Sequence, residues 1–214
     1  MYNKPNIDAI ILARKNSKRL LNKNIKRYKG RMLFEWSLIK AINSKIFSNI
    51  IISSDWEIIL DKSKQYKYPI KIDHRPENLC KSNTKSEDVI QYLIDKKYVK
   101  SKYIMLLQPT SPDRRIYDIK KCYYNTVKYN LNSLISLSSR HNSKKFSNEC
   151  IVYKNSKFKY FKKNSNLFFN GAIYLVKTKY FIKFRSLYST SIQYAHYMPY
   201  NFSKDIDTLE DLLS

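Results

Sequence analysis

The chain has 214 residues, which is enough for one domain with a well-buried core. Its formal net charge of +24 is compatible with nucleic-acid binding, but the lysines are scattered and accompany an excess of Asn, Ile and Tyr. We therefore attribute most of the charge to compositional bias and do not expect a nucleic-acid partner. No apolar run is long enough to span a bilayer, and the N-terminus lacks a secretory signal. The three cysteines are far apart and give neither a disulfide set nor metal-ligand spacing. We therefore expect a cytoplasmic protein without membrane insertion.

Strand-like apolar runs alternate with helix-like stretches along the first two thirds of the chain. The expected strands are 7–13, 49–53, 68–72, 103–107 and 133–137. The expected helices are 33–44, 56–65 (capped by Asp55), 86–97 and 117–129. This alternation predicts an α/β fold with βαβ crossovers and a mostly parallel sheet that carries helices on both faces.

The pattern changes after residue 138. Residues 139–166 are polar, basic and turn-rich, with a possible hairpin from 150–153 to 158–161, so we interpret them as an excursion from the main sheet. A strand at 169–176 follows. Asp207 is expected to begin the last helix, where Glu210 three residues later completes a capping-box pattern.

A basic loop directly follows the first strand and is a candidate phosphate site. Its side chains could offset the roughly four negative charges of a nucleoside triphosphate; they are Arg14, Lys18, Arg19 and Lys23, with Ser17 and Asn24 as further donors. The loop is not a Walker A motif. A solvated basic loop is the alternative, but the position after a strand favours function, because parallel sheets bind ligands at the carboxyl ends of their strands.

Two carboxylates near the end of the chain, Asp205 and Asp207, form a candidate metal site. Mg²⁺ prefers hard oxygen ligands and commonly takes one or two carboxylates together with substrate phosphates. If residues 205–207 are extended, both side chains point to the same side. The alternative is that Asp207 only caps the last helix with Glu210 as its partner, although both roles can coexist.

Five ordered segments carry specific motifs. They are the basic loop, 75–86 with Arg-Pro-Glu-Asn-Leu, 106–112 with Leu-Leu-Gln-Pro-Thr-Ser-Pro followed by Arg114, 170–174 with Asn-Gly-Ala-Ile-Tyr, and 205–212 with Asp-Ile-Asp-Thr-Leu-Glu-Asp-Leu. Together they resemble the cytidylyltransferases that activate nine-carbon 2-keto sugar acids, namely the CMP-sialic acid synthetases and their legionaminate and pseudaminate relatives. The ordered set covers nearly the whole chain and is specific.

The resemblance implies a role for individual residues. The CTP phosphates would contact Arg14, Ser17, Lys23 and Asn24. The cytosine and ribose would lie against Leu12, Ala13, Arg75 and Ser86. The sugar acid would contact Gln108, Asn170, Tyr174 and, through a looser match, Lys144. Mg²⁺, with Mn²⁺ as a possible substitute, would bind Asp205 and Asp207.

The resemblance also implies a Rossmann-like single domain over residues 1–214, a homodimer formed through 139–166, and a reaction. The hydroxyl at C2 of the sugar acid would attack the α-phosphate of CTP, with Arg14, Lys23 and the metal on Asp207 stabilising the charge on the pyrophosphate. The sequence departs from the family at Lys15-Asn16, where a glycine is usual, and at Phe168-Phe169, where a basic residue is usual.

Three alternatives remain open at this point. The substrate could be another sugar acid, such as an eight-carbon 2-keto acid. The chain could be a basic nucleic-acid-binding module, although paired aspartates would repel phosphates unless a metal intervenes. It could also be an inactive relative retained for assembly.

Overall fold

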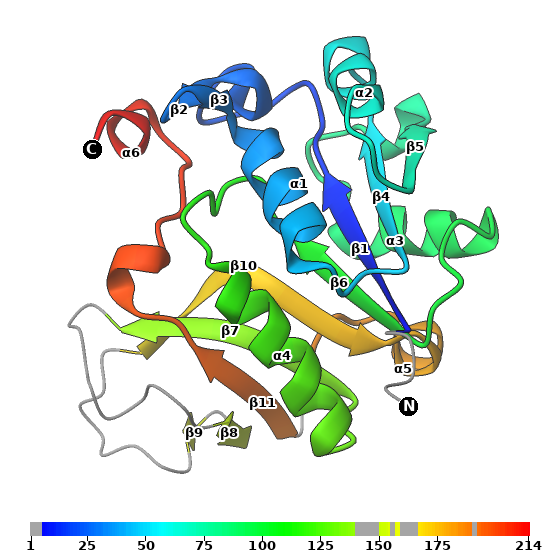
Figure 1. The fold of residues 1–214 in the computed structure, drawn as a ribbon, viewed down its shortest axis with the longest axis vertical. Helices are drawn as coiled ribbons and strands as arrows, with labels where there is room; N and C mark the ends of the chain where they lie inside the picture. Colours follow the sequence, from blue (N-terminus) through cyan, green and yellow to red (C-terminus); the bar gives the residue numbers. More distant parts are fainter. Residues whose placement is uncertain (1–5, 140–149, 155–156, 159–166, 190–191) are drawn as a thin grey trace.

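The computed structural model describes residues 6–139, 150–154, 157–158, 167–189 and 192–214. Its main sheet contains β1 (Ile7–Leu12), β4 (Asn49–Ser54), β5 (Ile70–His74), β6 (Tyr103–Leu107), β7 (Ser133–Ser139), β8 (Cys150–Lys154), β9 (Lys157–Phe158), β10 (Leu167–Lys177) and β11 (Ile192–Tyr197). In the part of the chain so described, these nine strands lie in the order β5-β4-β1-β6-β10-β7-β11-β8-β9 (Figure 1).

Most strands of this sheet run in one direction. Strands β5, β4, β1 and β6 pair in parallel, β10 is antiparallel to both β6 and β7, and β11 is parallel to β7. Among the described strands of this sheet, only β10 and β8 run in the opposite direction. The predicted mostly parallel sheet is therefore confirmed, and the carboxyl ends of β1, β4, β5 and β6 share one edge.

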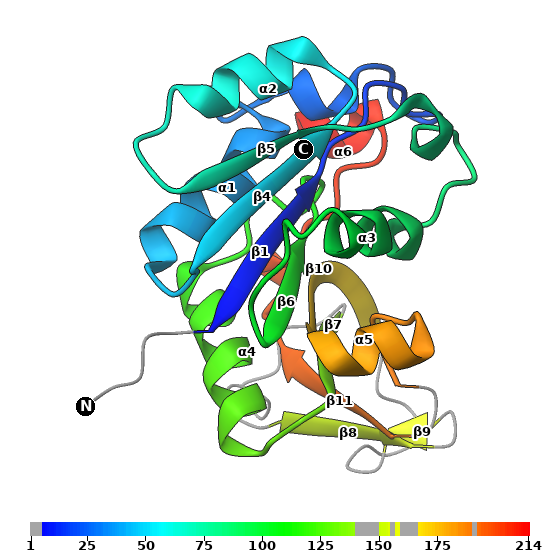
Figure 2. The ribbon, with the colours of Figure 1, turned by 90° about the vertical axis from the view of Figure 1, so that its right-hand side faces the viewer.

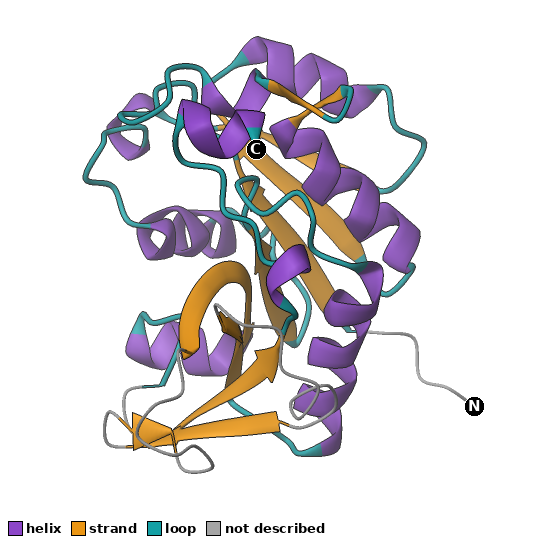
Figure 3. Ribbon diagram, turned by 90° about the vertical axis from the view of Figure 1, so that its left-hand side faces the viewer, coloured by secondary structure: helices purple, strands orange, loops and turns teal. Residues whose placement is uncertain are grey.

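Helices cover both faces of the sheet. One face carries α1 (Leu33–Ser44), α2 (Glu57–Lys64) and α4 (Ile116–Lys128), and the other carries α3 (Ser86–Asp95) and α5 (Thr178–Phe184). Figure 2 shows α1 and α4 on one side of β1 and β6 and α3 and α5 on the other; Figure 3 shows the same layers from the opposite direction. Within β1, Ala9 and Ile11 pack toward α1, whereas Ile10 packs toward α3, as the alternation of a strand requires.

Smaller elements surround the carboxyl edge. They are η1 (Lys23–Ile25), β2 (Arg27–Tyr28), β3 (Arg31–Met32), η2 (Glu77–Leu79), η4 (Tyr200–Phe202) and α6 (Leu209–Leu213). The turn between β2 and β3 has positive φ at Lys29 and Gly30, a geometry that suits a tight hairpin. Figure 1 shows α6 beside this hairpin, so the C-terminal helix lies close to a segment from the first part of the chain.

The positions of two helix caps differ from the prediction. Helix α2 begins at Glu57, and Asp55 does not cap it, because its carboxylate accepts a hydrogen bond from the Lys15 N–H at 2.7 Å. Helix α6 is capped by Thr208, whose side chain accepts from the Asp211 N–H at 3.2 Å. Asp207 is therefore not the cap, and Asp211 rather than Glu210 completes the capping box.

The predicted hairpin within 139–166 is present as β8 and β9, which pair antiparallel. Strand β8 also pairs with β11, so the hairpin continues the main sheet rather than leaving it. Residues 140–149, 155–156 and 159–166 lie outside the described residues, and dimerisation through this segment stays a prediction. Within the described helices, none is long and apolar enough to cross a membrane.

Candidate active site

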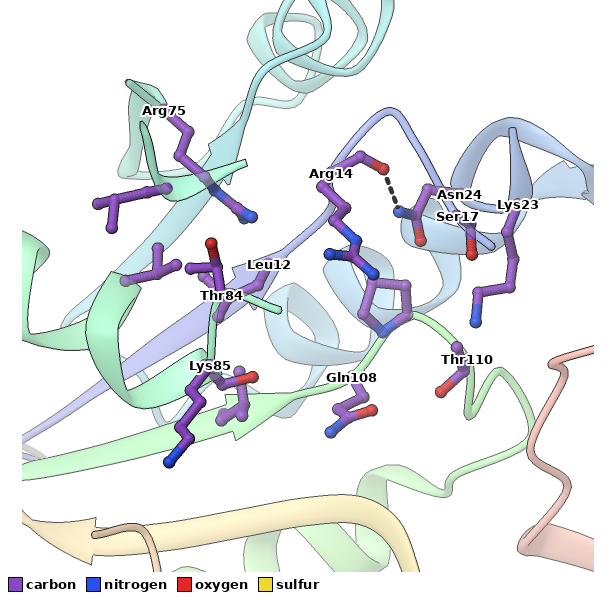
Figure 4. A pocket seen from close by; sticks show the side chains of 15 residues that line it. Leu12, Arg14, Ser17, Lys23, Asn24, Arg75, Thr84, Lys85, Gln108 and Thr110 are labelled. Atoms are coloured by element: carbon purple, nitrogen blue, oxygen red, sulfur yellow. Dashed lines mark hydrogen bonds between the residues drawn. The ribbon is translucent and has the colours of Figure 1, made fainter. Parts of the chain in front are cut away.

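A pocket opens at the shared carboxyl edge, between the loop after β1, the N-terminus of α3 and the loop after β6 (Figure 4). The predicted site residues that line it are Leu12, Arg14, Ser17, Lys23, Asn24, Arg75, Ser86 and Gln108. Sequence reasoning assigned no role to Thr84, Lys85 and Thr110, which also line the pocket and lie within the matched segments 75–86 and 106–112. The structure thus brings three segments that are distant in the sequence, 12–24, 75–89 and 106–110, to one site.

The pocket is cationic. Its lining includes Arg14, Lys23, Arg75 and Lys85, and none of the described residues that line it is acidic. The first residue of α3, Ser86, also faces it, so the positive end of the helix dipole adds to the field. This charge and these donors suit a polyanion.

Different residues line the two ends of the pocket. In Figure 4, Arg75 and Thr84 lie on one side, Ser17, Lys23 and Thr110 lie on the other, and Arg14 lies between them. Leu12, Leu79 and Val89 add apolar surface to the lining. A ligand with a flat, partly apolar group and a polyphosphate chain would fit such a division.

Internal hydrogen bonds hold the loop after β1. Ala13 is buried and does not line the pocket; its N–H donates to Ser53 O at 3.1 Å and its carbonyl accepts from Ser54 Oγ at 2.6 Å. The next carbonyl, of Arg14, accepts from Asn24 Nδ2 at 2.8 Å. Ala13 thus helps to fix the loop, and its expected contact with the nucleotide stays a prediction.

The guanidinium of Arg14 reaches across the pocket. Its Nη1 donates to the carbonyl of Lys81 at 2.8 Å, which joins the loop after β1 to the segment before α3. A left-handed residue in this loop is Asn22, with φ of 57°, rather than Lys15 or Asn16, where the family usually has glycine. Asparagine tolerates this conformation better than most side chains.

Arg75 is buried and fixed by a network that the sequence did not reveal. Its Nε donates to Ser53 Oγ at 3.1 Å and its Nη2 to Ser53 O at 2.7 Å. Ser53 Oγ in turn donates to Asp73 Oδ2 at 2.7 Å, and Asp73 also binds Lys96 Nζ at 2.9 Å. Burial lowers the pKa of Arg75, but guanidinium stays charged at neutral pH.

The loop after β6 is held by a second buried arginine. Arg114 Nη2 donates to Ser37 Oγ at 2.6 Å and to the Gln108 carbonyl at 3.1 Å, and its Nη1 donates to the Ala172 carbonyl. Burial lowers the pKa of Arg114 to about 9, so it remains a cation at neutral pH. The arginine joins the backbone of Gln108 to the bulge in β10, while the Gln108 side chain lines the pocket.

The Asn170 side chain is held by hydrogen bonds within the protein. This side chain is buried, accepts from Ser136 Oγ at 2.6 Å and from the Ala172 N–H at 3.2 Å, and donates to Ser203 Oγ at 3.0 Å. It therefore supports the bulge at Gly171, where φ is +67°, and its expected contact with the sugar acid stays a prediction.

Tyr174 is not among the residues that line the pocket and lies near the carboxylates of Asp205 and Glu87. Burial raises the pKa of its hydroxyl, and the nearby charges of Asp205 and Glu87 raise it further. A Cβ added at Gly171 would lie 3.8 Å from the Tyr174 hydroxyl, so the tyrosine covers the bulge. Lys144, the other predicted sugar contact, lies outside the described residues.

The basic loop and the C-terminal aspartate segment converge at Asp207, as the sequence predicted. Lys23 Nζ lies 2.6 Å from Asp207 Oδ1, and Arg19 Nη2 lies 2.5 Å from Asp207 Oδ2. Between the aspartates, the Ile206 N–H donates to the Thr110 carbonyl at 2.8 Å. The aspartate segment is thus fixed at the mouth of the cationic pocket.

Asp205 and Asp207 fit a magnesium site that is completed by phosphate oxygens. Partial desolvation raises the pKa of Asp205, and the like charge of Asp207 raises it further, although a hydrogen bond from Thr110 opposes the shift. Two repelling carboxylates are stabilised by a divalent cation. Within the described ranges, no three acidic, His or Cys side chains gather to hold a metal alone, so a bound phosphate would have to supply further ligands.

The family model described as cytidylyltransferase matches residues 9–212. The chain belongs to the cytidylyltransferase family. All the pocket residues and both aspartates lie within the matched range. The resemblance inferred from the ordered motifs is therefore confirmed at the level of the family.

Individual relatives are similar to this cytidylyltransferase over different lengths. It is 30% identical over 214 residues to CMP-N,N'-diacetyllegionaminic acid synthase of Legionella pneumophila, covering 94% of this chain and 90% of that protein. It is 27% identical over 215 residues to N-acylneuraminate cytidylyltransferase of Escherichia coli, covering 96% of this chain and 50% of that protein. Pseudaminic acid cytidylyltransferase of Campylobacter jejuni is 34% identical over 121 residues, 56% of this chain and 45% of that protein. The chain thus spans about half the length of the latter two relatives.

Solved structures confirm the fold. A CMP-2-keto-3-deoxy-manno-octonic acid synthetase complexed with CTP superposes with a TM-score of 0.71 at 13% identity, covering 97% of this chain and 95% of that one. A 4-diphosphocytidyl-2C-methyl-D-erythritol synthase from Anaerococcus prevotii superposes with a TM-score of 0.66 at 16% identity, covering 99% and 96%. At such identities the likeness concerns the Rossmann-like fold alone.

Proposed function

We propose that this cytidylyltransferase joins CTP to a nine-carbon 2-keto sugar acid, such as a sialic, legionaminic or pseudaminic acid, and releases pyrophosphate. The C2 hydroxyl oxygen of the sugar acid forms a bond to the α-phosphorus of CTP. The bond from that phosphorus to the bridging oxygen of the β-phosphate breaks, and the hydroxyl proton leaves to solvent. The products are the CMP-sugar and pyrophosphate.

The observation that carries this proposal is the cationic pocket joined directly to a pair of aspartates. Lys23 lines the pocket and contacts Asp207 at 2.6 Å, so the phosphate-binding loop and the candidate metal ligands are neighbours. Relatives named for legionaminic, pseudaminic and N-acylneuraminic acids support a nine-carbon acid as the acceptor.

The chain's own groups divide the work along the pocket. Arg75 and Ser86, with the apolar surface of Leu12, would position the cytosine and ribose. Arg14 and Lys23 would bind the phosphates and stabilise the negative charge that grows on the leaving pyrophosphate, with Ser17 as a further donor. Asn24 fixes the Arg14 peptide through its 2.8 Å hydrogen bond, so it would act on the phosphates through that backbone.

The acceptor would lie between the loop after β6 and the bulge of β10. Gln108 would hydrogen-bond the sugar acid, and the Tyr174 hydroxyl would contact it near Asp205. When bound to Asp205 and Asp207, Mg²⁺, or Mn²⁺ in its place, would polarise the α-phosphate and lower the pKa of the attacking hydroxyl. We further propose that the enzyme acts in the cytoplasm, where CTP is available, and that residues 139–166 form a homodimer.

A turnover panel tests the reaction. Pure protein would be incubated with CTP, Mg²⁺ and one acid at a time, using sialic, legionaminic and pseudaminic acids and an eight-carbon 2-keto acid, while pyrophosphate release is measured. We expect release that requires both CTP and a nine-carbon acid. Turnover with the eight-carbon acid alone would contradict the acceptor assignment, and no turnover with any acid would contradict the activity.

Asp207→Asn provides the matched test of the metal assignment. The substitution keeps the shape of the side chain but removes the charge, so we expect turnover to be lost while the fold is retained. Circular dichroism and thermal melting would check the fold. Near wild-type turnover in this variant would contradict the assignment of Asp207 as a metal ligand.

A further inference from the structure

Both carboxylate oxygens of Asp207 are already occupied by cations. Oδ1 contacts Lys23 Nζ at 2.6 Å, and Oδ2 contacts Arg19 Nη2 at 2.5 Å. The Lys23 and Asp207 side chains are only 12% and 20% exposed, so this pair is little screened by solvent. Arg19 is 68% exposed and can turn away at small energetic cost.

These contacts conflict with the two roles that the site has to fill. A divalent cation needs an oxygen of Asp207, but it would approach that oxygen against two positive charges. A triphosphate needs the ammonium of Lys23, which lines the pocket but is held by Asp207. Either ligand alone therefore meets a competing ion pair within the protein.

We propose that Asp207 exchanges its cations when substrate binds: Lys23 and Arg19 move to the triphosphate, and the carboxylate they release takes the divalent metal. This inference rests on the proposed function, because it needs a triphosphate in the pocket. It gives Arg19 a role in binding phosphate. It also makes CTP and metal binding mutually supportive, since each ligand removes the obstacle to the other, and such coupling is reciprocal.

The backbone allows this exchange without a large movement. Ile206 is fully buried and its N–H is held by the Thr110 carbonyl, so the aspartate segment stays in place. The Asp207 N–H donates to Asp211 Oδ2 at 3.0 Å, which fixes the residue independently of its own carboxylate. Only the flexible side chains of Lys23 and Arg19 have to change partners.

Binding of CTP to Asp207→Asn in the absence of metal tests the exchange. The amide no longer holds the two cations as ion pairs, so in EDTA we expect this variant to bind CTP roughly tenfold more tightly than the wild type, the effect of one close charge contact. In the wild type, Mg²⁺ should tighten CTP binding, and in the variant this effect should disappear. Isothermal titration calorimetry measures both affinities without turnover.

Glu210→Gln is the matched control. It removes one negative charge from the neighbouring helix, and Glu210 is exposed and makes no ion pair with Arg19 or Lys23 in the described part of the chain. We expect its CTP affinity in EDTA to equal that of the wild type. If Asp207→Asn binds CTP no more tightly than the wild type in EDTA, or if Glu210→Gln tightens binding equally, the exchange is refuted. No CTP binding by the wild type even with Mg²⁺ would refute the proposed function, and this inference with it.

A double-mutant cycle separates exchange from simple repulsion between Asp207 and CTP. If Lys23 is held by Asp207 without metal, Lys23→Met should weaken CTP binding in EDTA much less in the wild-type background than in the Asp207→Asn background. We expect a loss of about tenfold in the latter. An equal loss in both backgrounds indicates independent charges and would overturn the proposal.

The metal side of the exchange has a separate readout. Without nucleotide, the double variant Arg19→Gln/Lys23→Met should bind Mn²⁺ more tightly than the wild type, because Asp207 is no longer paired. Electron paramagnetic resonance of free Mn²⁺ measures this affinity directly. Equal Mn²⁺ affinity in the two proteins would contradict the proposal.

Discussion

Ile206 is expected to control the metal requirement of the enzyme by holding the aspartate segment in place. It is fully buried between the two aspartates and packs with Leu20, Tyr28 and Leu33 from the first part of the chain. Truncating a buried isoleucine to alanine costs about 2–5 kcal/mol. Because this cluster is small, and neighbouring side chains can partly fill the gap, we expect about 2 kcal/mol for Ile206→Ala.

That energy mainly holds the segment carrying the aspartates. Its other anchors among the described residues include the hydrogen bond to Thr110 and the ion pairs of Asp207, of which the exposed Arg19 pair is worth little. A loss of about 2 kcal/mol lowers the equilibrium constant for docking of this segment by a factor of roughly 30. The undocked form of the segment then competes with the docked form. We therefore expect the Mg²⁺ concentration for half-maximal rate to rise about tenfold or more.

Pyrophosphate release measured against Mg²⁺ concentration is the assay, with hydrogen exchange of residues 203–214 as the structural readout. Ile206→Val should give a smaller effect, because it loses only about 0.5–1.5 kcal/mol. Leu213→Ala is the control, since this side chain on the same segment is 78% exposed. An unchanged Mg²⁺ dependence in Ile206→Ala, with the segment still protected from exchange, would refute the reasoning.

Three further predictions concern the pocket and its support. Arg14→Gln should raise the KM for CTP at least about tenfold, because it removes a proposed phosphate contact and the hydrogen bond to Lys81. Steady-state kinetics measure this KM, and a near-normal value would show that Arg14 does not bind CTP. Gly171→Ala should destabilise the fold by about 1–2 kcal/mol, because a φ of +67° strains the backbone of a residue with a Cβ. A steric clash is not the cause, since the added Cβ would meet only the Tyr174 hydroxyl at 3.8 Å. Urea unfolding measures the free energy of unfolding, and an unchanged value would show that the bulge relaxes. Burial raises the pKa of Cys80 to about 11, so its thiol stays protonated at pH 8. It should therefore react with iodoacetamide roughly a hundredfold more slowly than a free cysteine, and the rate should rise with pH as thiolate forms. Rapid labelling of Cys80, measured by mass spectrometry, would contradict this.

The parallel half of the fold could be predicted because its signals are local. Apolar runs bounded by polar residues indicated β1 and β6, and the apolar spacing of α1 predicted the observed bounds of Leu33–Ser44. Strand β11 and helix α5 were not predicted. Tertiary pairing defines both: β11 lies between β7 and β8, and α5 packs its buried Phe181 on the same face of the sheet as α3.

Errors at single residues had a common cause, which is competition between local and distant partners for the same polar group. Asp55 could have capped α2, but the Lys15 N–H takes its carboxylate. The amide of Asn170 is likewise held by Ser136 and Ser203, which no local pattern indicates. No pattern within a short window reveals such partners, because they lie more than thirty positions away.

The amino-acid sequence by itself determined the family and the chemical groups available, because the ordered motifs carry basic side chains near one end and paired carboxylates near the other. Only the tertiary structure decided how these groups are used before a ligand arrives. The carboxyl edge of the sheet brings Lys23 and Arg19 onto Asp207, and a carboxylate that is open to metal in the sequence pattern becomes a neutralised ion-pair partner. The physical reason is that oppositely charged side chains at the mouth of one pocket pair with each other at short range, and chain separation does not predict that pairing.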